Sequence, residues 1–349
     1  MSINWETTTP CTEQITLDLI NALLKAEPLA ILHFGHMYSL INDLDPISAT
    51  QMEQYLTIQP LYLGNVSDGK WGMASEDARR CLYDIRRTQA FILGIICCIR
   101  ELQLELGRRN IYVVEAGGGT GILAIAAALA GADVVLLEIN EETAHRASKF
   151  INSLSLSEKI KVICTDATIY IPERKFDVII SECLHTGVVK EPQIQIMQHL
   201  GRYLNPNGKF LPEGVYLSWV LADTDWTGIE SDHIELSKIE KKIRSIGQWS
   251  QSPYLNFQIE SMKENIGKIM FIVPLHTGSS NSVIAAMDIT IYTPKSFVQP
   301  ITLISGEAAF LGQPHIWKLN TAINSEDGSY AFGYFTPGGT FPKVIYRIL

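Results

Sequence analysis

The sequence lacks the features of a secreted, membrane-bound or nucleic-acid-binding protein. None of its six cysteines form a C-x-x-C pair, so there is no zinc motif and no disulfide framework. Its 28 Lys and Arg are outnumbered by 37 Asp and Glu, and a net charge of −9 argues against a nucleic-acid partner. The longest apolar runs, 91–99 and 122–130, are too short to cross a bilayer. Because the N-terminus has no basic and apolar leader, we expect a cytoplasmic protein without a bound metal.

Composition and length indicate a globular protein with more than one structural region. Hydrophobic residues make up 46% and charged residues 19% of the chain, which is typical of a well-filled core. The 349 residues are enough for two domains, or for one domain with large additions. We expect a helical N-terminal region with a lid (1–108), an alternating β/α domain (109–212) and a β-rich domain (213–349). An acidic protein also suits a neutral or cationic substrate.

Apolar residues recur at helical spacing over residues 12–58. We therefore expect helices there, with Pro28 and Pro46 as breaks. The segment 61–73 is rich in glycine and predicts a loop that covers a site. A long helix is expected over 76–106, leading into the first strand.

The most informative segment is a strand followed by a glycine-rich turn and a helix. Residues 111–114 are apolar and β-branched or aromatic, as a central parallel strand requires. Gly117, Gly119 and Gly121 let the backbone turn sharply and approach a ligand closely. The helix expected over 122–129 points its positive N-terminal end at that ligand. The segment therefore predicts a site for a nucleotide-type cofactor in a mostly parallel α/β sheet.

Four successive predicted strands end in a carboxylate. These residues are Glu115, Glu138, Asp166 and Glu182, and they share the carboxyl edge, where open α/β sheets bind ligands. Glu138 lies 23 residues after Glu115, where an acid accepts hydrogen bonds from ribose hydroxyls. Asp166 is placed to accept from an adenine amino group. A dehydrogenase is the rival interpretation, but its fingerprint is G-x-G-x-x-G, whereas this turn reads G-x-G-x-G.

This combination resembles the class I S-adenosylmethionine (SAM) methyltransferases. The segment 115–121 looks like their first motif, Glu138 like their ribose acid and Asp166 like their adenine-side acid. The resemblance implies a Rossmann-like domain and SAM as the cofactor. The helix at 83–88 looks like one that supplies an arginine to the SAM carboxylate, and we expect Arg87 in this role, with Arg86 as the alternative.

The loop after the fourth strand resembles the double-glutamate loop of the protein arginine methyltransferases. Glu182 and Glu191 lie nine residues apart and could clamp a cationic nitrogen between two carboxylates. Residues 204–209 are expected to form a turn before another strand, and the segment 204–212 looks like the end of that family's Rossmann half. The order of helical region, SAM domain and β-barrel-like domain also agrees with the family.

Two histidines mark departures from that family. Its loop has an aromatic residue and Met-Gly after the first glutamate, whereas this chain has Cys183, Leu184 and His185. The family closes its pocket with Thr-His-Trp, but here His315 stands one place early, before Trp317. We treat His185 and His315 as candidate catalytic residues. His185 could act as a general base, or it could be a loop histidine bonded to backbone.

After residue 212 the pattern changes to short apolar runs separated by Gly, Pro, Ser and Asn. These runs predict an antiparallel β region, sandwich- or barrel-like. The charged segment Ile229 to Ile246 is expected to be a helix, either a solvated surface helix or an arm that makes a homodimer. We favour methyl transfer to a nitrogen, oxygen or carbon of a small-molecule or peptide acceptor, as in specialised metabolism. A protein arginine methyltransferase and a non-catalytic SAM-binding scaffold are the alternatives.

Overall fold

The computed structural model describes most of the chain. The described residues are 21–47, 72–188, 191–251, 255–256, 269–274, 278–295, 299–307, 313–325, 330–335 and 343–347. Most of the expected covering loop, residues 61–71, lies outside them. Among the described residues, no helix is both long and apolar enough to cross a membrane.

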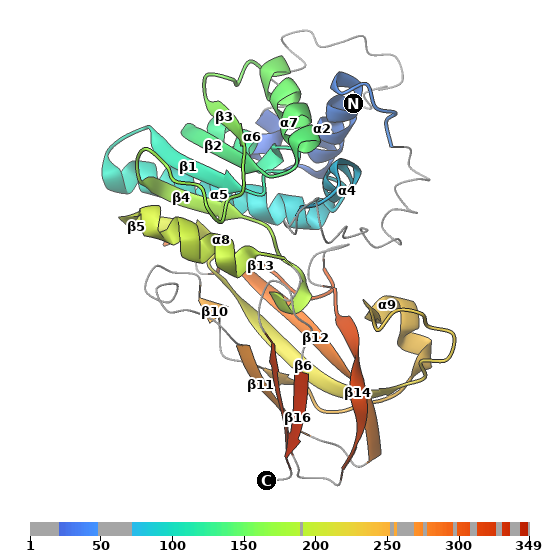
Figure 1. The fold of residues 1–349 in the computed structure, drawn as a ribbon. Coiled ribbons are helices and arrows are strands. Elements are labelled where there is room, and N and C mark those ends of the chain that lie inside the picture. Colours follow the sequence, from blue (N-terminus) through green and yellow to red (C-terminus); the bar gives the residue numbers. More distant parts are fainter. Residues whose placement is uncertain are drawn as a thin grey trace.

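The parallel part of the fold is built from five strands and the helices that precede and connect them (Figure 1). Its strands are β1 (Ile111–Ala116), β2 (Ala132–Glu138), β3 (Ile160–Cys164), β4 (Phe176–Ser181) and β5 (Leu204–Leu211). Its helices are α2 (Pro28–Ile41), α4 (Ser75–Cys81), α5 (Ile85–Leu106), α6 (Ile122–Leu129), α7 (Glu141–Ser153) and α8 (Gln193–Leu200), with 3₁₀ turns η2 (Thr186–Val188) and η3 (Gly201–Tyr203).

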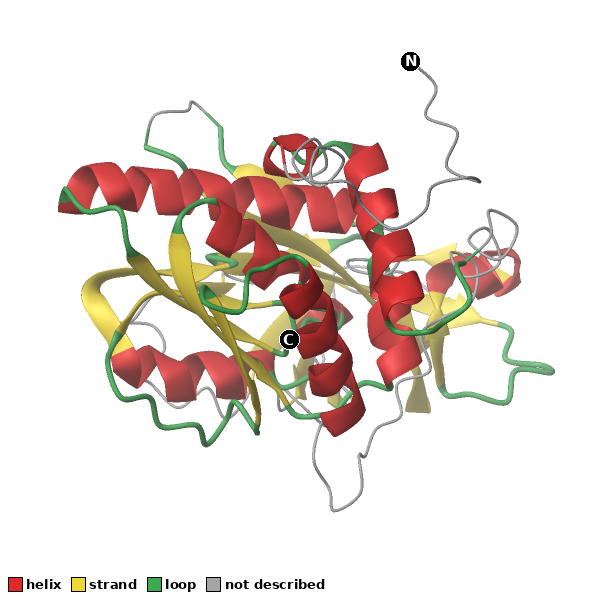
Figure 2. Cartoon of the chain, turned by 90° about the horizontal axis from the view of Figure 1, so that it is seen from above, coloured by secondary structure: helices red, strands yellow, loops and turns green. Residues whose placement is uncertain are grey.

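The sheet order is β3-β2-β1-β4-β5, with every neighbouring pair parallel. Viewed from above in Figure 2, helices cover both sides of the strands. The central strand β1 is almost entirely buried, which explains its run of β-branched residues. Strands β2 and β3 lie on one side of β1, and β4 and β5 lie on the other, so the order in which strands are added to the sheet switches sides at β1. Ligands bind at such switch points, outside the carboxyl ends of the strands.

The second part is antiparallel. Its long strands β6 (Gly214–Thr224), β12 (Gly278–Tyr292) and β14 (His315–Ser325) lie at the centre of a sheet ordered β10-β6-β12-β14-β7. The other elements are β7 (His233–Glu235), α9 (Leu236–Ile239), η4 (Glu240–Lys242), β8 (Ile243–Ile246), β9 (Ser250–Gln251), β10 (Leu255–Asn256), β11 (Ile269–Pro274), β13 (Ile301–Leu303), β15 (Tyr330–Phe335) and β16 (Lys343–Arg347). A Rossmann-like core followed by an antiparallel β region is the predicted fold class, which is confirmed.

The helix expected over Ile229 to Ile246 is wrong. Only α9 and η4 are helical there, and strands β7 and β8 flank them. The reason is a small apolar cluster under this segment, built from Val220, Ala222, Ile284, Ile316 and Ile239. Edge pairing of β7 with β14 and of β8 with β6 covers that cluster, so tertiary packing overrides the helical charge pattern.

Two further boundaries differ from the prediction. The helix expected over 76–106 is divided into α4 and α5, because the Asp84 side chain caps α5 by accepting the backbone N–H of Arg87 at 3.4 Å. The turn expected at 204–209 lies within β5. Its pairing with β4 jumps from Leu204 opposite Phe176 to Lys209 opposite Val178, so the predicted turn residues form an irregularity in the strand.

Candidate functional site

The glycine turn joins β1 to α6 as predicted. Gly117, Gly119 and Gly121 all have positive φ, at 73°, 54° and 81°, where other residues are strained. The N–H groups of Gly117 and Gly118 donate to the carbonyl of Leu137 at 2.9 and 3.0 Å, which ties the turn to β2. A Cβ on Gly117 would overlap the sulfur of Cys183, so this position has no room for a side chain.

The carboxylates of Glu138 and Glu115 accept hydrogen bonds from the backbone of this turn and of the helix after it. Glu138 accepts the N–H of Gly119 at 2.8 Å and that of Asn140 at 2.9 Å. Glu115 accepts the N–H of Ala124, in the first turn of α6, at 2.8 Å. Burial raises the pKa of both carboxyls, that of Glu115 well above its usual value, although the backbone hydrogen bonds oppose the shift.

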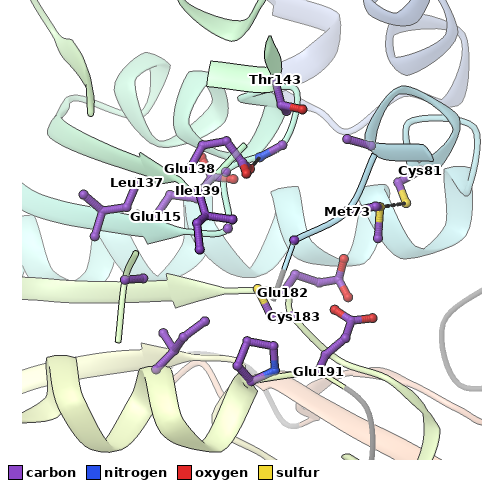
Figure 3. A pocket seen from close by; sticks show the side chains of 18 of the residues that line it. Met73, Cys81, Glu115, Leu137, Glu138, Ile139, Thr143, Glu182, Cys183 and Glu191 are labelled. Carbon is purple, nitrogen blue, oxygen red and sulfur yellow. Dashed lines mark hydrogen bonds between the residues drawn. The ribbon is translucent and has the colours of Figure 1, made fainter. Parts of the chain in front are cut away.

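A pocket of about 400 Å³ opens at the carboxyl edge of the parallel sheet (Figure 3). Every residue that the sequence assigns to the cofactor except Gly121 lines this pocket, and so do both glutamates of the loop. The lining includes Arg87, Glu115, Gly117, Gly119, Glu138, Asp166, Glu182 and Glu191, together with Gly72, Met73, Ala78, Cys81, Thr143, Cys183 and His233. Gly121, the N-cap of α6, is not part of the lining, although its neighbours Thr120 and Ile122 are.

Arg87 makes an ion pair with Glu182 at the pocket wall. Arg87 Nη1 donates to Glu182 Oε2 in a very short contact, and Nη2 donates to the carbonyl of Cys81 at 2.6 Å. Arg86, the alternative, has a side chain that is 56% exposed and pairs with Glu307 at 3.5 Å. The predicted contact of Arg87 with the SAM carboxylate stays a prediction, since the guanidinium is held here by Glu182.

Glu182, on the acceptor side of the pocket, is a perturbed carboxylate. Burial raises its pKa to about 7, although the charge of Arg87 acts in the opposite direction. Figure 3 shows the carboxylates of Glu182 and Glu191 turned towards the same part of the pocket, from the two ends of the loop after β4. The expected pair of facing carboxylates is therefore brought together.

Gln193 positions this loop, and the sequence analysis missed it. Its buried side chain accepts the N–H of Cys183 at 2.9 Å through Oε1 and donates to the carbonyl of Ser181 at 3.0 Å through Nε2. These two bonds fix the backbone on both sides of Glu182. Nothing in the sequence distinguishes Gln193 from a surface glutamine, because its partners lie ten or more residues away along the chain.

The two candidate catalytic histidines do not line the pocket. His185 is 5% and His315 2% exposed, and their rings contact each other with centroids 4.9 Å apart. His233 on β7 does line the pocket, and its ring centroid is 6.1 Å from that of His315. His233 was not predicted from the sequence, because it lies in the segment expected to be a helix.

The geometry agrees with the comparisons to known proteins. Residues 113–208 match the protein family described as "Methyltransferase domain". The chain contains a methyltransferase domain. The match spans β1 to β5, the strands whose carboxyl ends form the pocket, and it confirms the predicted class I domain with SAM as its cofactor.

Similar sequences include arginine methyltransferases. An arginine N(omega)-methyltransferase of Streptomyces achromogenes subsp. streptozoticus is 34% identical over 119 residues, which are 32% of this chain and 33% of that protein. A probable histone-arginine methyltransferase 1.4 of Arabidopsis thaliana is 43% identical over 29% of this chain and 19% of its own length. The matched part thus spans a third or less of these relatives.

Two solved structures share the fold over most of the chain. The Trypanosoma brucei PRMT1 enzyme–prozyme heterotetrameric complex with AdoHcy has a TM-score of 0.55 and 14% identity, covering 73% of this chain and 85% of that one. Arabidopsis thaliana protein arginine methyltransferase 10 has a TM-score of 0.53 and 15% identity, covering 75% and 94%. At such identity the likeness concerns the fold, including the β region outside the methyltransferase domain.

The pocket residues fit SAM on their own geometry. The Oγ1 atom of Thr143 is buried at the pocket wall and has no hydrogen-bond partner within the part of the chain that the structure describes. A ligand hydroxyl or amino group would satisfy it. Glu138 accepts the backbone N–H groups of Gly119 and Asn140 and lines the pocket, where its remaining lone pairs can accept ribose hydroxyls. Asp166 also lines the pocket, while its Oδ1 accepts from the backbone N–H and the hydroxyl of Thr168.

Proposed function

We propose that the chain is a SAM-dependent methyltransferase whose acceptor is the guanidinium group of arginine, either free or in a peptide. The observation that carries this proposal is the Arg87–Glu182 pair, in which Glu182 holds a guanidinium at the pocket wall. The similarity to arginine methyltransferases supports the same acceptor over the neutral or carbon acceptors that the sequence left open.

Glu182 and Glu191 bind and orient the acceptor in this proposal. Two carboxylates that face one guanidinium neutralise its charge, and their hydrogen bonds to its coplanar N–H groups fix its orientation. A carboxylate offers about four lone-pair sites, so the contact with Arg87 leaves Glu182 room for a second guanidinium. SAM, when bound, supplies an electrophilic methyl group. The protein contributes orientation and a pocket wall that keeps water out.

Charge-deleting variants test the acceptor. Glu182→Gln and Glu191→Gln keep the shape of each side chain but leave the cation half-paired, which costs about 3–5 kcal/mol. We expect both variants to lose methylation of free arginine and of an arginine peptide while retaining SAM binding by calorimetry. Glu173→Gln, at an exposed position outside the pocket lining, is the matched control. Normal turnover by either pocket variant would contradict a carboxylate clamp.

We also propose that the protein forms a homodimer. The segment expected to be a helical arm consists of β7, α9, η4 and β8. That segment still projects from the β region as a separate lobe in Figure 1. Light scattering at micromolar concentration should give twice the chain mass of 38.9 kDa, whereas the mass of a single chain would reject the dimer.

A further inference from the structure

One wall of the cofactor pocket is formed by a segment that precedes the parallel sheet along the chain. Residues 72–81, here called the wall segment, lead into α4 and include it. Four of them line the pocket, namely Gly72, Met73, Ala78 and Cys81. Figure 3 shows Met73 and Cys81 together on one side of it. Because the wall segment is part of neither the glycine turn nor the acceptor loop, other contacts must hold it at the pocket.

Asn140 joins the wall segment to the end of β2. It lies between β2 and α7 and is not itself part of the pocket lining. Its Nδ2 donates to the carbonyl of Met73 at 3.1 Å. Its Oδ1 accepts the N–H of Thr143 at 3.1 Å, which caps α7, and its own N–H donates to Glu138 at 2.9 Å. One residue outside the pocket therefore bonds to three residues that line it.

Arg146 makes a second contact between α7 and the wall segment. Its Nη1 donates to the Oγ of Ser75 at 3.0 Å, and Ser75 is the buried first residue of α4. Its Nη2 pairs with Glu142 at 2.6 Å on the same helix, which helps to hold the guanidinium in place. Helix α7 is thus bonded to the wall segment at two points, the carbonyl of Met73 and the hydroxyl of Ser75.

The bond from Asn140 to Met73 can be removed without removing the cap of α7. The cap needs only a side-chain oxygen that accepts, whereas the carbonyl of Met73 needs a donor. Serine and aspartate cap helices about as well as asparagine. A serine hydroxyl ends one bond short of the Nδ2 position, and an ionised aspartate has the shape of asparagine but no N–H. Both replacements therefore separate the two roles of this side chain.

We propose that Asn140 is a positioning residue for SAM, which holds the wall segment against the bound cofactor. While its bond to Met73 is made, the wall segment and the expected ribose acid Glu138 are fixed to the same residue. Without that bond the carbonyl of Met73 loses this donor and the wall segment separates more easily from α7, so SAM leaves faster. The inference needs SAM as the cofactor, and it does not depend on the proposed arginine acceptor.

The test compares Asn140→Ser and Asn140→Asp with wild type. Both should weaken SAM binding in calorimetry by about tenfold, through faster release of tritiated SAM. In assays on arginine, KM for SAM should rise by the same factor while kcat at saturating SAM stays near wild type. A merely structural defect would instead lower kcat, because it reduces the fraction of folded enzyme.

Asn42→Ser is the matched control. The Nδ2 of Asn42 also donates to a backbone carbonyl, that of Tyr38 at 2.9 Å, but it does so at the end of α2 and away from the pocket lining. Asn42→Ser should leave the affinity for SAM unchanged. The unfolding temperatures of the two Asn140 variants without SAM should fall no further than that of this control.

Ser75→Ala tests the second contact without touching the cap of α7. It removes the acceptor of Arg146 and should also weaken SAM binding. Folded Asn140→Ser and Asn140→Asp proteins that bind SAM within twofold of wild type contradict the positioning role. If neither folds, unchanged SAM affinity in Ser75→Ala contradicts a wall segment held by α7. A wild-type protein that binds SAM but methylates no arginine contradicts the proposed acceptor alone.

Discussion

Glu138 offers the sharpest test of the cofactor pocket. Its two carboxylate oxygens each accept one backbone N–H, from Gly119 and Asn140, and the remaining lone pairs are expected to accept two ribose hydroxyls. A hydrogen bond to a charged group contributes about 1.5–3 kcal/mol. Loss of two such bonds in Glu138→Ala should therefore weaken SAM binding by at least about 100-fold.

The assay is isothermal titration of SAM and of its demethylated product into purified variants. Asp133→Asn is the matched control, because Asp133 lies at the other end of β2 and pairs with Lys159 at 2.8 Å away from the pocket. The unfolding temperature of Glu138→Ala must be measured as well, since the same carboxylate supports the glycine turn. A folded Glu138→Ala protein that binds SAM within a few-fold of wild type would refute the assignment of Glu138 to the ribose.

Three further predictions follow from neighbouring contacts. Arg87→Ala should raise KM for SAM much more than Arg86→Ala, because only the first side chain lines the pocket; the reverse ranking in steady-state kinetics would identify the wrong arginine. Burial raises the pKa of Glu182 to about 7, and its ionised form is the one that binds a cation. The kcat/KM for arginine should therefore fall by up to about tenfold per pH unit below 7, and a flat profile from pH 6 to 8 would contradict this role. Gln193→Leu leaves the N–H of Cys183 without its partner and should cost about 2–4 kcal/mol in urea unfolding, with a fall in kcat; unchanged stability would mean that the loop does not depend on Gln193.

The cofactor half of the site was predictable because its signals are local. The spacing of Gly117, Gly119 and Gly121 and the acids at strand ends depend on backbone conformation and on the shared carboxyl edge of a parallel sheet. Both are properties of short segments and of their order along the chain. Glu115 and Glu138 come at the carboxyl ends of β1 and β2, which brings their carboxylates to the backbone N–H groups of Ala124 and Gly119.

The acceptor half was less predictable because its parts come from distant segments. His233 reaches the pocket only because β7 pairs with the edge of β14, a contact that no local pattern indicates. The charged residues after it are typical of an amphipathic helix, and the apolar cluster that favours strands is assembled from β6, β12 and β14. Gln193 was missed for the same reason, since its partners are backbone atoms of Ser181 and Cys183.

The most direct test of the central claim is mass spectrometry of arginine after incubation with the purified protein and SAM that carries a trideuterated methyl group. We expect a deuterated methyl group to be transferred to a guanidino nitrogen of free or peptide arginine, and Glu182→Gln to abolish the transfer. A protein that binds SAM but labels neither form of arginine, or that labels it equally well as Glu182→Gln, would contradict the account.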